Sequence, residues 1–269
     1  MYDYKIVNIY KIKNLNTASA SRCRDVSKNF VRLPCETDIH SADLLELARC
    51  RCWAEIDLSA FKRNIRRMRR LVGHGVEILI PVKSDAYGHG IVEIVRSATE
   101  EGISFFGVSS LEEAITMREA GVSGKILFLT APLPEQLPHF LQYEITPVLS
   151  DLETARRLGE LALARRKVAA VHVEVDTGMG RTGIPWRHAS RELLKFTEVE
   201  GIKLEGVMTH FSKADDTSVD FTMIQLERFQ DILSELPVSL VDEICIHASN
   251  SAASLRFPKA RFSMIRPGL

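Results

Sequence analysis

The chain lacks an excess of charge of either sign, because 35 lysines and arginines balance 35 aspartates and glutamates over 269 residues. Balanced charge gives no general attraction to nucleic acid or to an anionic membrane surface. No apolar run approaches the roughly 20 residues of a membrane span, and residues 1–16 lack the apolar core of a secretory signal. We therefore expect a cytoplasmic protein with no membrane or nucleic-acid partner.

Cysteine is also scarce, with five residues in the whole chain: Cys23, Cys35, Cys50, Cys52 and Cys245. An odd count without a signal peptide favours reduced thiols in a cytosol. Only one residue separates Cys50 from Cys52, whereas about two to four residues separate the usual zinc-binding pair. We expect no metal site.

The N-terminal region carries little periodic pattern. Leu44, Leu45 and Leu47 indicate at most the start of a short helix, so we treat residues 1–50 as an unassigned extension and residues 51–269 as one folded domain. Apolar residues from Leu58 to Val72 fall at helical spacing after a cap at Asp57 or Ser59. The opposite face is basic, which is typical of a solvated helix face and less often of a nucleic-acid contact. The basic residues are Lys62, Arg63, Arg66, Arg67 and Arg70.

Short apolar runs then alternate with amphipathic segments to the end of the chain. Near-continuous apolar strands joined by helices indicate a parallel sheet. The predicted strands cover residues 78–82, 105–108, 125–129, 145–149, 171–175, 204–208, 244–247 and 262–265, and helices include 110–120, 151–164, 188–199 and 222–233. Eight such strands predict an α/β fold of the (β/α)₈ barrel type, which typically takes about 250 residues. An open doubly wound sheet is the alternative, but no Gly-rich turn follows the first strand.

One lysine, Lys83, follows the first apolar run directly. A lysine delivered by an apolar strand is costly to keep charged, which makes it a candidate Schiff-base amine. A lysine whose stem packs on apolar surface before a Gly-rich turn would give the same sequence pattern. When this segment is considered by itself, both interpretations stay open.

Further polar motifs follow the later strands, where a barrel places its chemistry. They are residues 83–90, 176–183, 209–211, 247–253 and 266–269. Each has a structural alternative: a Gly-rich turn for 176–183, a structural histidine for His210, and a helix cap for Asn250 and Ser251. Loops after the last two strands commonly bind phosphate, which Ser251 and the backbone of Gly268 and Leu269 could do here. A lysine, a phosphate cradle and an arginine are the parts of a pyridoxal 5'-phosphate site.

Five segments together resemble the signature blocks of alanine racemase, in the same order. They read PVKSDAYGHG, VEVDTGMGRTGI, MTHFSKAD, ASNSAA and MIRPGL, and the similarity runs from about Trp53 to the last residue. Single-barrel proteins that bind pyridoxal phosphate share the fold and the lysine, but we do not expect the DTGMGR and NSAA blocks in them.

The resemblance implies a role for each matching residue. Lys83 would hold the cofactor covalently and act as a catalytic base. Tyr87 and Ser251, with the backbone at Gly268 and Leu269, would bind its phosphate. Other positions complete the pocket: Arg181 at the phenolic oxygen and the substrate carboxylate, His210 against the ring, Asn250 as support, and Arg266 at the ring nitrogen. An arginine at that nitrogen disfavours ring protonation, which suits racemisation over transamination.

The chain departs from the family at Glu174, where members commonly carry a carbamylated lysine. We hypothesise that Glu174 replaces the carbamate by pairing directly with Arg181. The sequence also stops at the end of the eighth predicted strand, whereas the family continues into a β-domain. In the family homodimer that domain supplies a tyrosine as second base, and no residue here matches it. We expect the strand at 53–57 to lack its sheet neighbours and racemisation to be impaired.

The resemblance therefore implies a pyridoxal-phosphate-dependent isomerase that interconverts L-alanine and D-alanine, the latter for the cell wall. Its substrate would be a small amino acid, and the full-length family is homodimeric. Three alternatives remain open: a non-catalytic or regulatory pyridoxal-phosphate-binding barrel, a racemase of another small amino acid such as serine, and a nonfunctional product of an interrupted gene.

Overall fold

The computed structural model describes residues 10–14, 52–216 and 221–268, and the chain divides into two units, Met1–Ala60 and Phe61–Leu269. The short helix predicted near Leu44 lies outside the described residues, as does Leu269. The boundary predicted at residues 50 and 51 stays a prediction.

In the first unit, β1 (Tyr10–Asn14) pairs antiparallel with β2 (Cys52–Ile56), and Tyr10 stands opposite Ile56. The expectation that this strand lacks a sheet neighbour is therefore wrong. The partner comes from the extension, where Tyr-Lys-Ile-Lys alternates apolar and polar residues as a strand does. Helix α2 (Leu58–Val72) follows, and Asp57 caps it because its Oδ1 accepts from the Ala60 amide at 2.8 Å.

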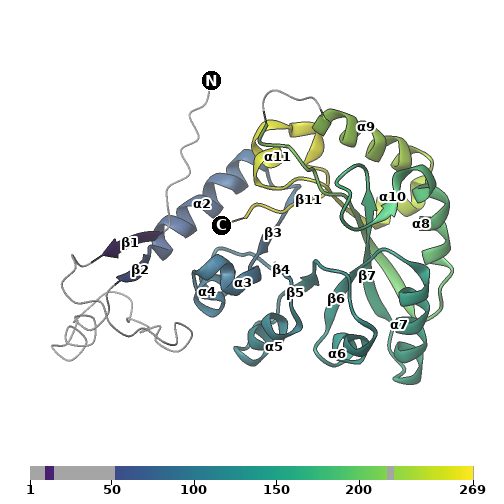
Figure 1. The fold of residues 1–269 in the computed structure, drawn as a ribbon, viewed down its shortest axis with the longest axis horizontal. Helices are drawn as coiled ribbons and strands as arrows, with labels where there is room; N and C mark the ends of the chain where they lie inside the picture. Colours follow the sequence, from purple (N-terminus) through teal and green to yellow (C-terminus); the bar gives the residue numbers. More distant parts are fainter. Residues whose placement is uncertain (1–9, 15–51, 217–220, 269) are drawn as a thin grey trace, which may run out of the picture. The chain divides into compact units, whose positions relative to one another are not determined.

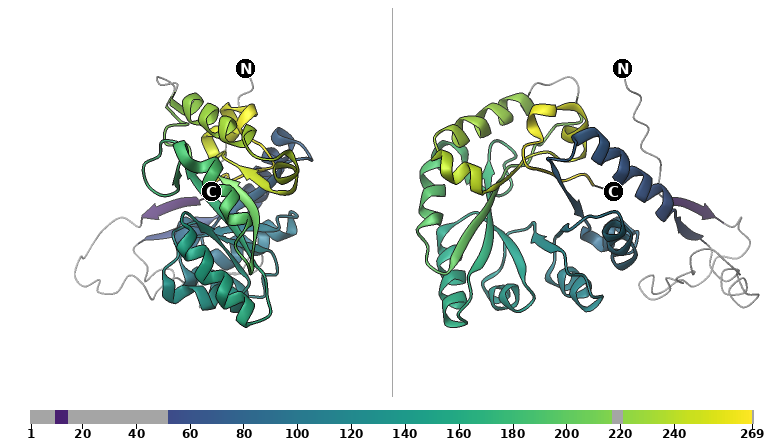
Figure 2. Two further views of the ribbon diagram at one scale, coloured as in Figure 1. Left: turned by 90° about the vertical axis from the view of Figure 1, so that its right-hand side faces the viewer. Right: turned by 180° about the vertical axis from the view of Figure 1, so that it is seen from behind.

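The second unit is a ring of parallel strands with helices outside it (Figure 1, Figure 2). The ring consists of β3 (Glu77–Pro81), β4 (Phe105–Val108), β5 (Lys125–Phe128), β6 (Ile145–Leu149), β7 (Ala169–Asp176), β9 (Ile202–Met208), β10 (Cys245–His247) and β11 (Met264–Ile265). A two-residue strand, β8 (Ile184–Pro185), adds to β7. All eight predicted strands are present.

Closure distinguishes this barrel from an open sheet. Strand β11 pairs with β3, with Met264 opposite Glu77 and Ile265 opposite Ile78. Strand β6 pairs with β7, with Val148 opposite His172. Each neighbour in the ring is parallel to the next, so every strand ends at the same rim. The predicted (β/α)₈ barrel is confirmed, and the doubly wound alternative is excluded.

The helices of this unit connect successive strands around the ring (Figure 1). They are α3 (Lys83–Gly88), α4 (Ile91–Glu100), α5 (Leu111–Glu119), α6 (Leu137–Gln142), α7 (Leu152–Ala164), α8 (Ala189–Thr197), α9 (Phe221–Ser234), α10 (Val238–Glu243) and α11 (Ser251–Arg256). Short 3₁₀ turns occur at Pro134–Gln136, Trp186–His188 and Pro258–Ala260. None of the described helices is long and apolar enough to cross a membrane.

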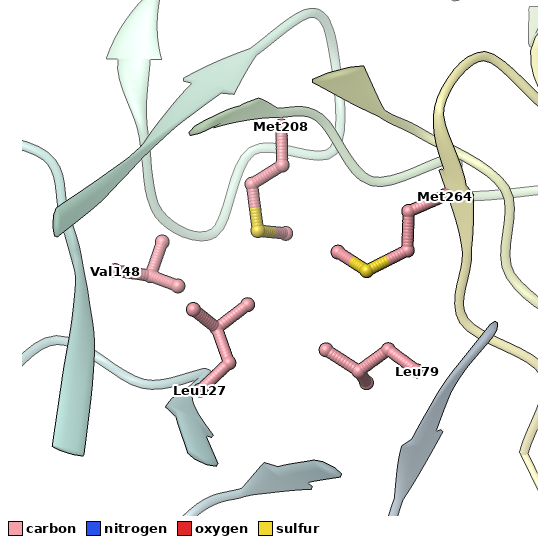
Figure 3. Packing of buried hydrophobic residues seen from close by; sticks show 5 residues of the cluster. All are labelled: Leu79, Leu127, Val148, Met208 and Met264. Carbon is pink, nitrogen blue, oxygen red and sulfur yellow. The ribbon is translucent and has the colours of Figure 1, made fainter. Parts of the chain in front are cut away.

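The inside of the barrel is filled by side chains from strands far apart in the sequence. Five of them point toward one another between β3, β5, β6, β9 and β11 (Figure 3), and each is at most 3% exposed. They are Leu79, Leu127, Val148, Met208 and Met264. Burial of one such side chain contributes about 1.5–3 kcal/mol. The inside of the barrel is therefore a packed core, and polar side chains that could act on a ligand are expected at the rim.

A buried histidine, His172, packs over a glycine at an irregularity in the pairing of β7 and β9. The register shifts between Val171 and His172, so that His172 stands opposite Gly206. The imidazole lies over this glycine: a Cβ at position 206 would be 2.4 Å from both Cε1 and Nδ1 of His172. The missing side chain makes the space that the ring occupies.

The basic face of α2 packs beside the C-terminal end of α4. Lys62 pairs with Glu100, and Arg66 donates to both carboxylate oxygens of Glu101 at 2.5 and 2.7 Å. Arg69 donates to the carbonyl of Glu101 at 2.6 Å. These cations therefore meet acidic groups and carbonyls at a helix end, where positive charge is favourable, rather than forming an uninterrupted basic surface.

We predict that Gly206→Ala lowers the free energy of unfolding by about 1–3 kcal/mol, the usual cost of overpacking a core. The added methyl would clash with the His172 ring and approach the carbonyl of Cys245 to 2.8 Å. Gly75→Ala is the matched control, because nothing lies within 4 Å of its Cβ position. Urea denaturation measures both variants. Equal stability of the two would show that the ring does not occupy the space over residue 206.

Candidate active site

The segment after β3 is a turn of left-handed helix. Four consecutive non-glycine residues, from Ser84 to Tyr87, have φ between 52° and 57°. This conformation costs roughly 1–2 kcal/mol per residue, so the surroundings must hold it in place. The turn folds Lys83 and Tyr87 to the same side, with Lys83 Nζ 5.9 Å from the centroid of the Tyr87 ring.

The carboxylate of Glu113, on α5, holds this turn. It accepts from the Ser84 amide at 2.5 Å, and from the Ser109 and Ser110 amides at 2.8 and 3.1 Å. Burial raises the pKa of Tyr87, and the negative charge of Glu113 raises it further. The Tyr87 phenol therefore stays protonated at neutral pH and can donate a hydrogen bond.

Three polar groups meet where β3, β10 and β11 end. The Gly268 amide donates to Ser251 Oγ at 2.7 Å. A Cβ on Gly268 would lie 3.4 Å from Ser251 Oγ and 3.6 Å from the Tyr87 hydroxyl. The missing side chain leaves a small space beside two hydroxyls that can donate to an oxyanion, and the Gly268 N–H holds one of them, that of Ser251, in place. The structure thus brings together Tyr87, Ser251 and Gly268, while Leu269 lies outside the described residues.

Asn250 positions this cradle. Its Oδ1 accepts from the Ala253 amide at 3.0 Å and caps α11, so the structural interpretation of this residue is confirmed. Its Nδ2 donates to the carbonyl of Phe211 at 3.2 Å. The start of α11 is therefore tied to the loop that follows β9.

Arg266 is buried at the rim, and its guanidinium donates three hydrogen bonds. Its Nη1 donates to Nδ1 of His247 at 2.8 Å, and its Nη2 donates to the Thr209 and Ala248 carbonyls at 2.8 and 3.2 Å. Burial lowers the pKa of Arg266 to about 10, so the guanidinium remains charged at neutral pH. His247 must accept on Nδ1 and therefore carries its proton on Nε2, 2.8 Å from Nδ1 of His172.

His172 and His247, which are hydrogen-bonded to each other, are both neutral at neutral pH. Burial lowers the pKa of His172 to about 3 and that of His247 well below its ordinary value. Neither histidine has a role predicted from the sequence. The sequence did carry a signal for His172, which stands between two valines in an apolar strand. An imidazole buried there needs a hydrogen-bond partner.

The charges of the remaining predicted cations act on His210. Its pKa is lowered to about 3, mainly by burial and to a smaller extent by the charges of Arg266, Arg181 and Lys83. Three of the predicted cations therefore lie within electrostatic reach of one imidazole. Arg181 itself is exposed and forms no ion pair with any residue that the structure describes.

The contact expected between Glu174 and Arg181 is not formed. Glu174 is 4% exposed and accepts from the Thr182 hydroxyl at 2.6 Å, and no ion pair joins it to Arg181 within the described ranges. The physical reason is burial: the carboxylate lies inside the barrel wall, whereas the Arg181 side chain extends into solvent. Burial raises the pKa of Glu174, although the Thr182 hydrogen bond and the charge of Arg181 act in the opposite direction.

Comparison with known proteins agrees with these features. The family model for the alanine racemase N-terminal domain matches residues 56–269. Alanine racemase of Halothermothrix orenii is 39% identical over 217 residues, which are 81% of this chain and 57% of that protein. This chain thus spans little more than half the length of the relatives it matches.

Solved structures give the same result. Alanine racemase from Clostridium difficile 630 superposes with a TM-score of 0.73 at 31% identity, over 77% of this chain and 55% of that one. Histidine racemase from Leuconostoc mesenteroides superposes with a TM-score of 0.71 at 25% identity, over 79% and 56% of the two chains.

We predict that Glu174→Gln stabilises the protein at pH 8 and that this gain disappears by about pH 4. Because the folded-state pKa of Glu174 is raised above 4.5, wild-type stability falls as pH rises through that raised value. Glutamine can still accept from Thr182 but buries no charge. Chemical denaturation at several pH values measures the effect, with exposed Glu198→Gln as the control. A loss of stability at pH 8 would contradict the burial argument.

Proposed function

Because the chain belongs to the alanine racemase family, whose N-terminal domain it matches, we propose that it forms the cofactor-binding barrel of an alanine racemase. The proposal includes pyridoxal 5'-phosphate as cofactor, a small amino acid as substrate, and interconversion of L-alanine and D-alanine. The observation that carries it is the cradle of Tyr87, Ser251 and Gly268 beside Lys83.

The residues present fit this cofactor. The cradle supplies donors for a phosphate, and the space at Gly268 is one that any side chain would fill. Lys83 lies beside it, and its charge is felt by His210. When bound, pyridoxal 5'-phosphate supplies an aldehyde for covalent attachment and an electron-withdrawing ring, which acidifies the Cα proton of an attached amino acid.

Each rim residue then has a proposed task. The Lys83 amine would hold the cofactor and would accept or return a proton at Cα on one face. Arg181, which is exposed and without an ion pair among the described residues, offers a planar fork to the substrate carboxylate. Neutral His210 would lie beside the cofactor ring without adding charge.

Arg266 is proposed to face the ring nitrogen. Its pKa of about 10 means that it donates hydrogen bonds at neutral pH and takes up no further proton. His247 and two carbonyls hold it in place. A fixed cation there would disfavour protonation of the ring nitrogen and so moderate the electron withdrawal that the cofactor would supply.

The similarity to histidine racemase favours one second candidate, a racemase of another amino acid on the same barrel. Homodimerisation, a cytoplasmic location and supply of D-alanine to the cell wall are proposed on the strength of the family alone, since this chain spans about 57% of its curated relative.

We predict that the chain mixed with pyridoxal 5'-phosphate develops a visible absorbance band, and that Lys83→Ala abolishes it. Lys213→Ala is the matched control, because Lys213 is an exposed lysine in the loop after β9. Lys83→Arg tests whether charge alone suffices, and we expect no band from it. A band of wild-type intensity in Lys83→Ala would refute attachment at this residue.

The same preparations, incubated with L-alanine and then resolved by chiral chromatography, test the reaction itself. Lys83-dependent formation of D-alanine supports a racemase. Cofactor binding without any change in chirality, for alanine, serine and histidine alike, would instead support a non-catalytic cofactor-binding barrel.

We predict that Tyr87→Phe weakens the affinity for pyridoxal 5'-phosphate about tenfold, as loss of a hydrogen bond to a charged group does. The affinity for pyridoxal, which lacks the phosphate, should not change. Spectroscopic titration with both compounds separates phosphate recognition from ring binding. Tyr143→Phe, at the end of α6, is the control. Equal weakening toward both compounds would place Tyr87 outside the phosphate site.

A further inference from the structure

A fully buried glutamine on α9, Gln225, uses all of its hydrogen-bonding positions on two loops of the rim. It is 0% exposed, and its Nε2 donates to the Thr177 hydroxyl at 3.2 Å and to the His210 carbonyl at 3.0 Å. Its Oε1 accepts from the amide and hydroxyl of Ser212 at 3.0 and 3.2 Å. An amide side chain offers two donors and two acceptor lone pairs, so none is left over.

The backbone dictates which way this amide faces. The Ser212 N–H can only donate and the His210 carbonyl can only accept, so the oxygen of Gln225 must face Ser212 and its nitrogen must face His210. No rotation of the amide satisfies both loops in another way. A single rigid group therefore specifies the spacing between them.

The contacts of Gln225 reach the residues that carry the proposed chemistry. Thr177 opens the glycine-rich loop that leads to Arg181, and its hydroxyl lies 2.7 Å from the Thr209 hydroxyl. The Thr209 carbonyl accepts from Arg266 Nη2 at 2.8 Å. Gln225 is thus hydrogen-bonded to the loops that follow β7 and β9, and it is connected through Thr209 to Arg266.

A second side chain of α9 holds the same loop from outside. Arg228, three residues after Gln225 and hence on the same helix face, donates to the Thr177 carbonyl at 2.7 Å. Its guanidinium carbon lies 4.7 Å from the centroid of the Trp186 ring. Both the hydroxyl and the carbonyl of Thr177 are therefore held by α9.

The loop itself leaves little room for another arrangement. Gly178 has φ of 140°, and a Cβ there would lie 2.7 Å from Phe221 Cζ. The glycine lets the chain pass close to α9, and the bonds from Gln225 and Arg228 then keep it there.

We propose that Gln225 is a positioning residue. It fixes the loop of residues 177–183, which carries Arg181, relative to His210, so that Arg181 and His210 can contact the same bound cofactor and substrate. This inference rests on the proposed function. Gln225 acts through Thr177, His210 and Ser212, so its removal would leave the Lys83 anchor intact while displacing the other side of the pocket.

Three variants of the full chain test this role. Gln225→Leu removes every bond of the amide, and Gln225→Glu keeps the shape but replaces the NH₂ that donates to Thr177 and His210 with an oxygen. Gln230→Leu makes the first change at an exposed position of the same helix and is the matched control. Far-UV circular dichroism confirms that each variant is folded, and Gln225→Glu carries the test where Gln225→Leu does not fold.

Two readouts are needed. Hydrogen exchange without cofactor reports whether residues 177–183 and 209–213 are held together, and we expect faster exchange in both segments for the Gln225 variants only. Titration with pyridoxal 5'-phosphate reports the pocket. We expect about tenfold or greater weakening, with a changed circular dichroism of the visible band, whereas Gln230→Leu matches the unsubstituted chain.

Two results would overturn the proposal. Unchanged exchange in both segments would show that Gln225 does not couple the loops. Faster exchange with unchanged cofactor affinity and unchanged visible dichroism would leave Gln225 a structural residue only. Failure of the unsubstituted chain to bind the cofactor would overturn the proposed function, and the exchange data would still decide whether the loops are coupled.

Discussion

The site depends on the backbone pairing between β11 and β3, which closes the barrel. Met264 and Ile265 stand opposite Glu77 and Ile78, so the chain that follows each strand emerges at the same rim. Lys83 comes after one strand, and Arg266 and Gly268 come after the other. Without closure these groups would lie at opposite edges of an open sheet, and the cradle beside Lys83 would not exist.

Polar groups below the rim make that arrangement rigid. Arg266, His247 and His172 form one hydrogen-bonded chain, in which burial keeps both imidazoles neutral and the guanidinium charged. Glu113 holds the left-handed turn that carries Lys83 in the same way. Fully satisfied buried networks specify one geometry, because any displacement leaves a desolvated polar group unpaired.

Much of this arrangement could be predicted from local pattern. Apolar runs identified all eight strands, since burial on both faces needs continuous hydrophobic sequence. The rim positions of Lys83, Tyr87, Ser251 and Gly268 followed from the strand ends. Local pattern failed where pairing was long-range: β1 was missed as the partner of β2. It also failed where a carboxylate had a choice of partners, because Glu174 bonds to Thr182 rather than Arg181.

The amino-acid sequence by itself determined the number of strands, their order and the chemical groups delivered to the rim, because period and burial are local properties of the chain. Only the tertiary structure decided which of those groups meet. Gln225, Glu113 and His172 show the reason: each is one polar residue in an ordinary helix or strand. Its role appears only when folding brings distant backbone groups within hydrogen-bonding distance and removes the water that would otherwise satisfy them.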